Sequence, residues 1–295
     1  MMIRTTGLVL ASTVTALALS GCERPPVDTE QAGFRGTAIV KVTNPRLVPE
    51  VSVPEPLPPV PQVGPKAGDI YQNVQVLGDL SVTEFNRTMQ AATQWVAPEQ
   101  GCNYCHNPEN LASDEKYTKV VARRMHQMTR DINGNWTPHV GETGVTCYTC
   151  HRGQNVPEYI WFADDSEPYG SDFAGWRAGQ NMANYELGTT SLPAGAFDLL
   201  TREGSQIRVQ NNDSPFPVEG TPGIKQTEHT FGLMIHMSGA LGVNCTYCHN
   251  SNNFATWTTS SPMRVNAWYG LNMVKSLNEN YLIPLGPVYP EYRLG

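Results

Sequence analysis

Charge is scarce in this 295-residue chain, and the smaller share of it is basic. Charged residues make up 16% of the sequence, with 20 Lys and Arg against 27 Asp and Glu, for a formal net charge of -7. An acidic surface repels a phosphate backbone, which argues against nucleic acid as a partner and is compatible with a basic protein partner. Composition alone slightly favours ordinary solubility charge over such a partner.

Long apolar runs are also missing, except at the N-terminus. Arg4 precedes an apolar stretch from Gly7 to Leu19, and Ser20-Gly21-Cys22 follows it. A basic start, a short apolar region and small residues before a cleavage point predict an export signal. Leu-Ser-Gly-Cys also fits a bacterial lipoprotein box, in which Cys22 becomes lipidated; a chance cysteine is the simpler alternative. Retention as a membrane helix stays open: the apolar run is shorter than the ~20 residues that a span needs, but residues 1–21 just reach that length. Either way, we expect an anchor on the periplasmic face of the cytoplasmic membrane.

Cysteine is nearly absent outside one repeated pentapeptide, Cys-x-x-Cys-His, which uses six of the seven cysteines. Its three copies are Cys102–His106, Cys147–His151 and Cys245–His249. This pattern is the attachment signature of c-type haem. Residues three apart lie on one side of a helical turn, so both thiols can reach the vinyl groups of one porphyrin while the imidazole coordinates iron. A zinc site or a redox dithiol also uses paired cysteines, but zinc does not require a histidine after each pair.

The sequence therefore predicts three covalently bound c-type haems. Their thioether bonds would come from Cys102, Cys105, Cys147, Cys150, Cys245 and Cys248, and one iron ligand each from His106, His151 and His249. Such a protein moves single electrons and needs no catalytic acid, base or nucleophile, so we expect no enzyme activity of its own.

Each iron needs a sixth ligand, and methionine or histidine usually supplies it. A helical segment with methionine precedes every motif: residues 83–96 carry Met89, residues 117–130 carry Met125 and Met128, and residues 229–238 carry Met234. We expect Ser81 or Thr83 to cap the first of these helices. Core packing is the commoner role of a lone methionine. His236 competes with Met234 for the third haem.

An internal repeat bears on the choice between Met125 and Met128. Residues 102–112 match residues 245–255, and residues 128–136 match residues 273–281. Met128 matches Met273, after which no further motif follows, whereas Met125 matches Gly270. Met125 is therefore the better candidate ligand.

The predicted fold is mainly α with extensive loops, a multihaem c-type cytochrome built from a duplicated helix–CxxCH–helix module. Ten of the 23 prolines lie in residues 23–66, which favours an extended arm that is a spacer or lies along a partner. A loop-rich connector separates the two modules, with short strands such as Gln206–Gln210. The expected divisions are 1–22 for the signal, lipobox or retained anchor, 23–66 for the arm, 67–155 for the first two-haem module, 156–226 for the connector, and 227–295 for the second module with one haem.

Longer stretches carry a family resemblance: Tyr71–Gly78, Glu84–Met89, Ala122–Met125, Gly144–Gly153 and Asn280–Pro284. Together with the lipobox, they resemble the cytochrome subunit of photosynthetic reaction centres from purple bacteria, over nearly the whole chain. The resemblance implies a subunit on the periplasmic face of the reaction centre that rereduces the photo-oxidised bacteriochlorophyll special pair. It implies Met89, Met125 and Met234 as sixth ligands of the first, second and third haems. It also places the haem of Cys245 and Cys248 nearest the special pair.

The resemblance further implies the core subunits and the surrounding light-harvesting ring as neighbours, and a soluble c-type cytochrome or similar protein as donor. The typical family member holds four haems, and its fourth motif would lie beyond the end of this sequence. A histidine matching His139 completes that fourth site. We therefore expect a three-haem member in which His139 hydrogen-bonds locally or fills the space, or else a truncated sequence. An independent, membrane-anchored multihaem carrier in respiration is the alternative function, and a structural lipoprotein stabilised by its haems is a third.

Overall fold

The computed structural model describes residues 28–31, 40–43, 54–157, 192, 200, 223–241 and 243–293. Its elements are β1 (Asp28–Gln31), β2 (Val40–Thr43), α2 (Ala67–Ile70), α3 (Val82–Val96), η2 (Gly101–Tyr104), α4 (Tyr117–Asn135), α5 (Thr137–Val140), α6 (Cys147–His151), α8 (Ile224–Leu241), η3 (Cys245–Tyr247), α9 (Pro262–Leu277), η4 (Asn278–Leu282), η5 (Ile283–Val288) and η6 (Glu291–Arg293). The described part of the chain is thus mainly helical, as predicted.

Helix α3 begins where its sequence places a cap. The Ser81 hydroxyl accepts a hydrogen bond from the Glu84 amide at 3.2 Å, and a Glu84 carboxylate oxygen accepts one from the Ser81 amide at 3.1 Å. This reciprocal pair satisfies two backbone donors that the first turn of a helix leaves open. Ser81 is therefore the cap, whereas the Thr83 hydroxyl donates to the Pro61 carbonyl at 2.8 Å.

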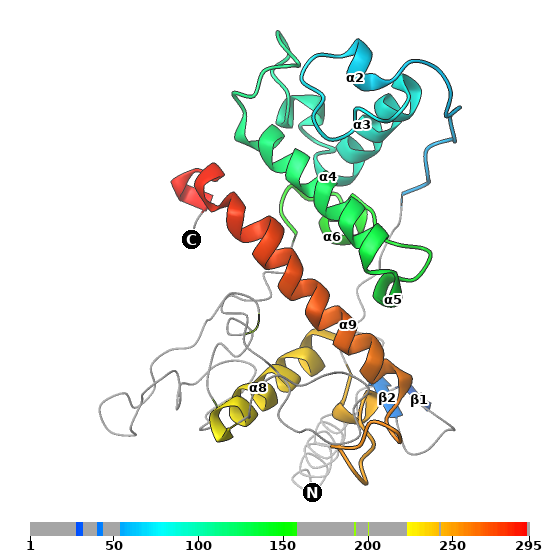
Figure 1. The fold of residues 1–295 in the computed structure, drawn as a ribbon, viewed down its shortest axis with the longest axis vertical. Coiled ribbons are helices and arrows are strands. Elements are labelled where there is room, and N and C mark those ends of the chain that lie inside the picture. Colours follow the sequence, from blue (N-terminus) through cyan, green and yellow to red (C-terminus); the bar gives the residue numbers. More distant parts are fainter. Residues whose placement is uncertain are drawn as a thin grey trace, which may run out of the picture.

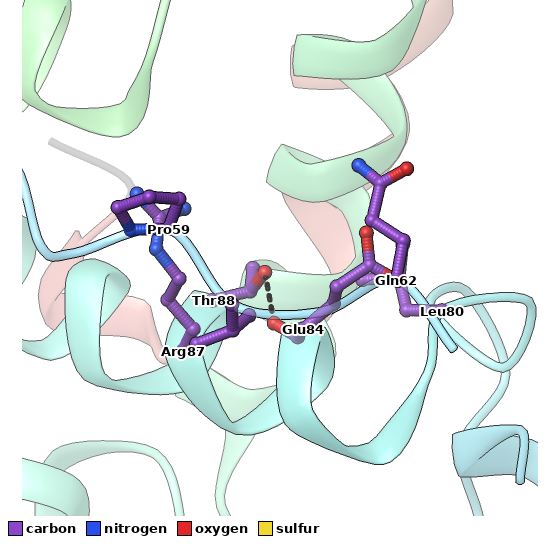
Figure 2. Close-up of a pocket in the computed structure, with 7 residues that line it drawn as sticks. Pro59, Gln62, Leu80, Glu84, Arg87 and Thr88 are labelled. Atoms are coloured by element: carbon purple, nitrogen blue, oxygen red, sulfur yellow. Dashed lines mark hydrogen bonds between the residues drawn. The ribbon is translucent and has the colours of Figure 1, made fainter. Parts of the chain in front are cut away.

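The last part of the proline-rich range lies on α3 rather than apart from it. Arg87 of α3 donates from Nε to the Pro58 carbonyl at 2.8 Å and from Nη2 to the Leu57 carbonyl at 2.7 Å. Pro59 and Gln62 line a surface pocket together with α3 side chains (Figure 2). Proline carbonyls have no backbone partner in an extended segment, so a charged donor on a neighbouring helix can fix that segment in place.

The arm predicted as extended also contains a hairpin. Strands β1 and β2 pair antiparallel, with Asp28 opposite Thr43 and Gln31 opposite Val40. The β-branched residues of Val40–Thr43 favour such pairing. Strand β2 contacts η3, the turn of the third motif. The range 23–66 is therefore not one uniformly extended arm.

Helix α9 joins two parts of the molecule (Figure 1). One part contains α2 to α6, and the other contains α8 and the hairpin. Helix α9 contacts α5, and its Leu271 packs with Leu233 of α8 and with Leu200. The turns η4 and η5, which continue α9, contact α4. The predicted strand Gln206–Gln210 and most of the connector lie outside the described residues, as do residues 1–27.

None of the helices in the described ranges combines the length and apolarity needed to cross a bilayer.

Candidate haem-binding site

The three Cys-x-x-Cys-His motifs fold as short helical turns. The first and third motifs form the 3-10 turns η2 and η3, and the second motif forms the short helix α6. In η2 and η3 the histidine amide donates to the carbonyl of the first cysteine, at 2.9 Å for His106 and 3.0 Å for His249. One turn of helix therefore presents two thiols and an imidazole together, as the spacing predicts.

None of the six motif cysteines is paired in a disulfide. Burial raises the pKa of the Cys105, Cys147, Cys150 and Cys248 thiols, so these side chains are neutral at physiological pH. Among the described residues, no three His, Cys, Asp or Glu side chains gather in a cluster that could hold a metal ion. The motifs thus present three separate thiol pairs rather than one four-cysteine zinc arrangement.

Each motif histidine is held by its Nδ1 atom. Nδ1 of His106 lies 3.0 Å from the Leu111 carbonyl, that of His151 lies 3.0 Å from the Gln154 carbonyl, and that of His249 lies 3.0 Å from the Phe254 carbonyl. A carbonyl oxygen can only accept, so Nδ1 carries the proton and Nε2 keeps its lone pair. This is the arrangement of a metal-ligating histidine whose other nitrogen is fixed by a backbone partner.

The imidazoles of the second and third motifs are also in environments that keep them neutral. Burial lowers the pKa of His151 and of His249. The Phe254 ring stacks on the His249 ring, with centroids 5.4 Å apart and planes 26° apart. A neutral imidazole with a free Nε2 and two adjacent thiols fits a c-type haem.

The candidate sixth ligands lie on the helices that precede the motifs. Met89 is on α3, Met125 on α4 and Met234 on α8, and all three side chains are partly exposed. Each of their carbonyls accepts a bond from a hydroxyl one turn later: from Thr93 at 2.8 Å, Thr129 at 2.9 Å and Ser238 at 2.9 Å. Such back-bonding turns the hydroxyl onto the helix backbone and often bends the helix.

Helix α3 packs against the first and second motifs. Helix α3 contacts both η2 and α6. The amide of Gly153, just after the second motif, donates to the Trp95 carbonyl of α3 at 2.9 Å, and Asn155 donates to the Val96 carbonyl at 2.8 Å. Met89 therefore lies on a helix held against the turn of the first motif and the short helix of the second.

Helix α4 is tied to the second motif by one asparagine. Asn133 donates to the Val145 carbonyl at 2.9 Å and accepts from the Val145 amide at 2.7 Å. Gly144 precedes this pair with a φ of 63°, and a Cβ there would lie 2.5 Å from the Asn133 Oδ1 atom. Only glycine therefore suits this turn between the Met125 helix and α6.

The third motif follows α8 directly, because the Val243 amide donates to the Ser238 carbonyl at 3.0 Å. Met234 and Met237 both pack against the cluster of Leu200, Leu233 and Leu271. His236 is two residues from Met234, about 200° around a helix of 3.6 residues per turn, and so points another way. Both residues stay candidates for the sixth ligand at the third motif.

Of the two expectations for His139, the local hydrogen bond differs from the structure, because its hydrogen-bond partner lies far along the chain. Its Nδ1 lies 3.0 Å from both the main-chain and the side-chain oxygen of Asn266, 127 residues further along. Its ring packs on Gly270, where a Cβ would lie only 2.6 Å from the His139 Cε1 atom. His139 thus joins α5 to α9 across the molecule.

Sequence reasoning missed the cations that hold the loops after two motifs. Lys119 of α4 donates to the carbonyls of Leu111 and Ser113, at 2.8 and 2.9 Å. Arg264 of α9 donates to the Thr256 carbonyl at 2.9 Å. These two residues are 145 apart, the offset that relates Met128 to Met273, so the repeat itself contained the signal.

Turns with paired thiols and a carbonyl-held imidazole define the class of c-type cytochromes. Within that class, the chain belongs to the family of photosynthetic reaction centre cytochrome c subunits, whose family model matches residues 23–295.

Named relatives agree with this family over most of the chain. The photosynthetic reaction center cytochrome c subunit of Rubrivivax gelatinosus is 49% identical over 297 residues, covering 99% of this chain and 81% of the relative. The subunit of the same name from Thermochromatium tepidum is 47% identical, covering 96% of this chain and 70% of the relative. The subunit of the same name from Roseobacter denitrificans is 45% identical, covering 90% of this chain and 75% of the relative.

Proposed function

We propose that this chain passes electrons from a soluble periplasmic donor, through covalently bound haems, to the photo-oxidised bacteriochlorophyll special pair of a photosynthetic reaction centre. One observation carries the proposal: three motif turns leave a histidine Nε2 free for iron, in a chain of the reaction-centre cytochrome family. A haem, when bound, supplies the one-electron ferric/ferrous couple.

The chain's own residues attach and orient three haems in this proposal. The cysteine pairs form the thioether bonds, and His106, His151 and His249 are the fifth ligands. Met89, Met125 and Met234 are the sixth ligands, and a methionine sulfur favours ferrous iron and so raises the reduction potential. The preceding helices, the back-bonded hydroxyls and the α3 contacts to η2 and α6 support this assignment.

A duplicated module is part of the same proposal. Residues 67–155 would form a two-haem module, residues 227–295 a second module with one haem, and residues 156–226 a connector. The matched turns η2 and η3, each with its histidine held by the carbonyl five residues on, support the duplication. So do the matched loop-holding cations Lys119 and Arg264.

The proposed setting is the periplasmic face of the photosynthetic membrane. Lipid at Cys22, or an uncleaved helix in residues 1–22, would anchor the chain beside the reaction-centre core and the light-harvesting ring. The donor would be a soluble c-type cytochrome or a similar protein. The chain would act as an electron carrier without a catalytic site, since electron transfer requires only close haems and tuned potentials.

Flash spectroscopy on isolated membranes tests this function. With the haems reduced beforehand, a saturating flash should bleach the haem α-band in step with rereduction of the special pair, and its amplitude should report how many haems take part. A normal special-pair signal without haem oxidation would overturn the proposal and favour an independent respiratory carrier.

A further inference from the structure

Lys119 shares a hydrogen-bond acceptor with the histidine of the first motif. The lysine is buried, with only 7% of its surface exposed. Its ammonium donates to the Leu111 carbonyl at 2.8 Å, and the same oxygen accepts from Nδ1 of His106 at 3.0 Å. The Leu111 carbonyl therefore accepts hydrogen bonds from both a charged ammonium and a candidate iron ligand.

The charge on Lys119 is only partly neutralised. Asp114 lies 3.4 Å from the ammonium, but its carboxylate is closer to Arg123, at 2.7 Å, and also accepts from Asn73 at 2.9 Å. Lys119 and Arg123 thus share the Asp114 carboxylate, so this one anion does not neutralise both cations. In a buried position this charge is screened much less than at the surface.

The sharing has a definite electronic effect. A carbonyl that accepts from Nδ1–H raises the basicity of the imidazole, and a more basic ligand stabilises ferric iron. An ammonium on the same oxygen withdraws electron density, so the carbonyl accepts less strongly from the imidazole. Its charge also opposes the extra positive charge of ferric iron. Both effects favour the ferrous state and raise the reduction potential.

The matched position in the repeat is arranged differently. Arg264 donates through Nη1 to the carbonyls of Ala255 and Thr256, at 3.4 and 2.9 Å, whereas His249 uses the carbonyl of Phe254. The Arg264 guanidinium also lies over the Trp257 ring, 4.0 Å from its centroid. In this loop the Arg264 guanidinium therefore binds the two carbonyls that follow Phe254, whereas His249 uses the Phe254 carbonyl.

We propose that Lys119 is a positioning residue that raises the reduction potential of the first haem through the carbonyl it shares with His106. This inference rests on the haem ligation of the proposed function. It assigns a role to a residue that touches neither the cysteines nor the iron ligand directly.

The test uses the full, haem-loaded chain and the variants Lys119→Met and Lys119→Gln. Lys116→Met is the matched control, because Lys116 donates to the Asn103 carbonyl inside the same motif and carries the same charge. A redox titration gives the potentials, and the wave of the first haem is assigned with His106→Met. Proton NMR of the reduced, diamagnetic protein follows the Nδ1–H resonance of His106.

We expect Lys119→Met to lower the first potential by about 59 mV, a tenfold rise in the ratio of oxidised to reduced haem at fixed ambient potential. The Nδ1–H resonance should move downfield as its hydrogen bond strengthens. Lys119→Gln keeps a hydrogen-bond donor without the charge and guards against misfolding of the methionine variant. It should shift the reduction potential and the Nδ1–H resonance in the same directions as Lys119→Met. Lys116→Met should change the ratio much less and leave the resonance in place.

Unchanged potentials and an unchanged resonance in both Lys119 variants would overturn the inference. So would an equal drop in Lys116→Met with no change in any resonance, since charge alone would then explain it. Failure of the ligation is distinguishable: if His106→Met leaves all three titration waves and the haem spectrum intact, His106 is not a ligand and the proposed haem site itself is wrong.

Discussion

Single side chains decide how the helices of this protein begin and how its loops are held. Ser81 is 1% exposed and caps α3, the helix that carries Met89. Asp114 binds Arg123 and Asn73 and so fixes the loop after the first motif. Neither residue is a candidate haem ligand, yet both set the position of elements that carry one.

Removing the cap should destabilise the protein. Ser81→Ala leaves the Glu84 amide without its side-chain acceptor in a buried place, and we expect a loss of about 1–2 kcal/mol in the free energy of unfolding. Thr83→Ala is the matched control, because it removes the hydrogen bonds of the Thr83 hydroxyl to Pro61 and Ser81 but leaves the capping pair of Ser81 and Glu84 in place. Guanidinium unfolding of both variants measures the difference, and an equal loss in the two would contradict the assignment of Ser81 as the cap.

Acid should weaken the loop at Asp114. The hydrogen bond from Arg123 holds the pKa of this carboxyl well below its usual range. A depressed pKa contributes stability above the unfolded value of about 3.9, and that stability is lost as pH falls further. Because the pair is partly exposed, the contribution is modest, below about 1 kcal/mol. Asp114→Asn should therefore unfold with a weaker pH dependence below about pH 4; an unchanged acid-unfolding profile would contradict this.

Among the elements, α5 packs closely against α9 at Gly270. The His139 ring occupies the place where a side chain at Gly270 would begin. Helix α9 itself starts at a local signal, since the Ser261 hydroxyl accepts from the Met263 amide at 3.2 Å and Pro262 follows the cap. The start of the helix is thus set locally, whereas its contact with α5 is set by a residue more than 120 positions away.

This contact reverses the usual effect of glycine replacement. Gly270→Ala should destabilise the protein by about 1–3 kcal/mol, because its Cβ would overlap His139. Gly134→Ala in α4 is the matched control, since a Cβ there meets nothing within 4 Å. Helix propensity alone should make that variant more stable by roughly 0.5–1 kcal/mol. Thermal unfolding compares them, and stabilisation by both would show that His139 moves away freely.

The same contrast separates what the sequence could predict from what it could not. The motif turns and the helices α3, α4 and α8 depend on neighbours within a few residues, and the sequence predicted them. Lys119 with Leu111, and His139 with Asn266, depend on how loops and distant helices meet. No local pattern encodes those pairs, although the 145-residue offset between Lys119 and Arg264 was readable once loop-holding cations were known to matter.

At the scale of the whole molecule, the formal charge of -7 bears on how the proposed soluble donor would approach. If the donor is a basic cytochrome, its second-order rate of haem reduction should fall as ionic strength rises from about 0.01 M to about 0.15 M, where the Debye length shrinks from about 30 to about 8 Å. Stopped-flow mixing at a series of salt concentrations measures this rate. A flat or rising rate would show that net charge does not steer the encounter.

Helix α9 has a further consequence at this scale. It is 16 residues long, about 24 Å at the usual rise, and its contacts with α5 and α8 lie at neighbouring residues, because Gly270 meets His139 and Leu271 packs with Leu233. One turn of α9 therefore joins the part that carries the first two motifs to the part that carries the third. A change of packing at this one turn would reach both parts at once, so it would alter how the first two motifs lie relative to the third.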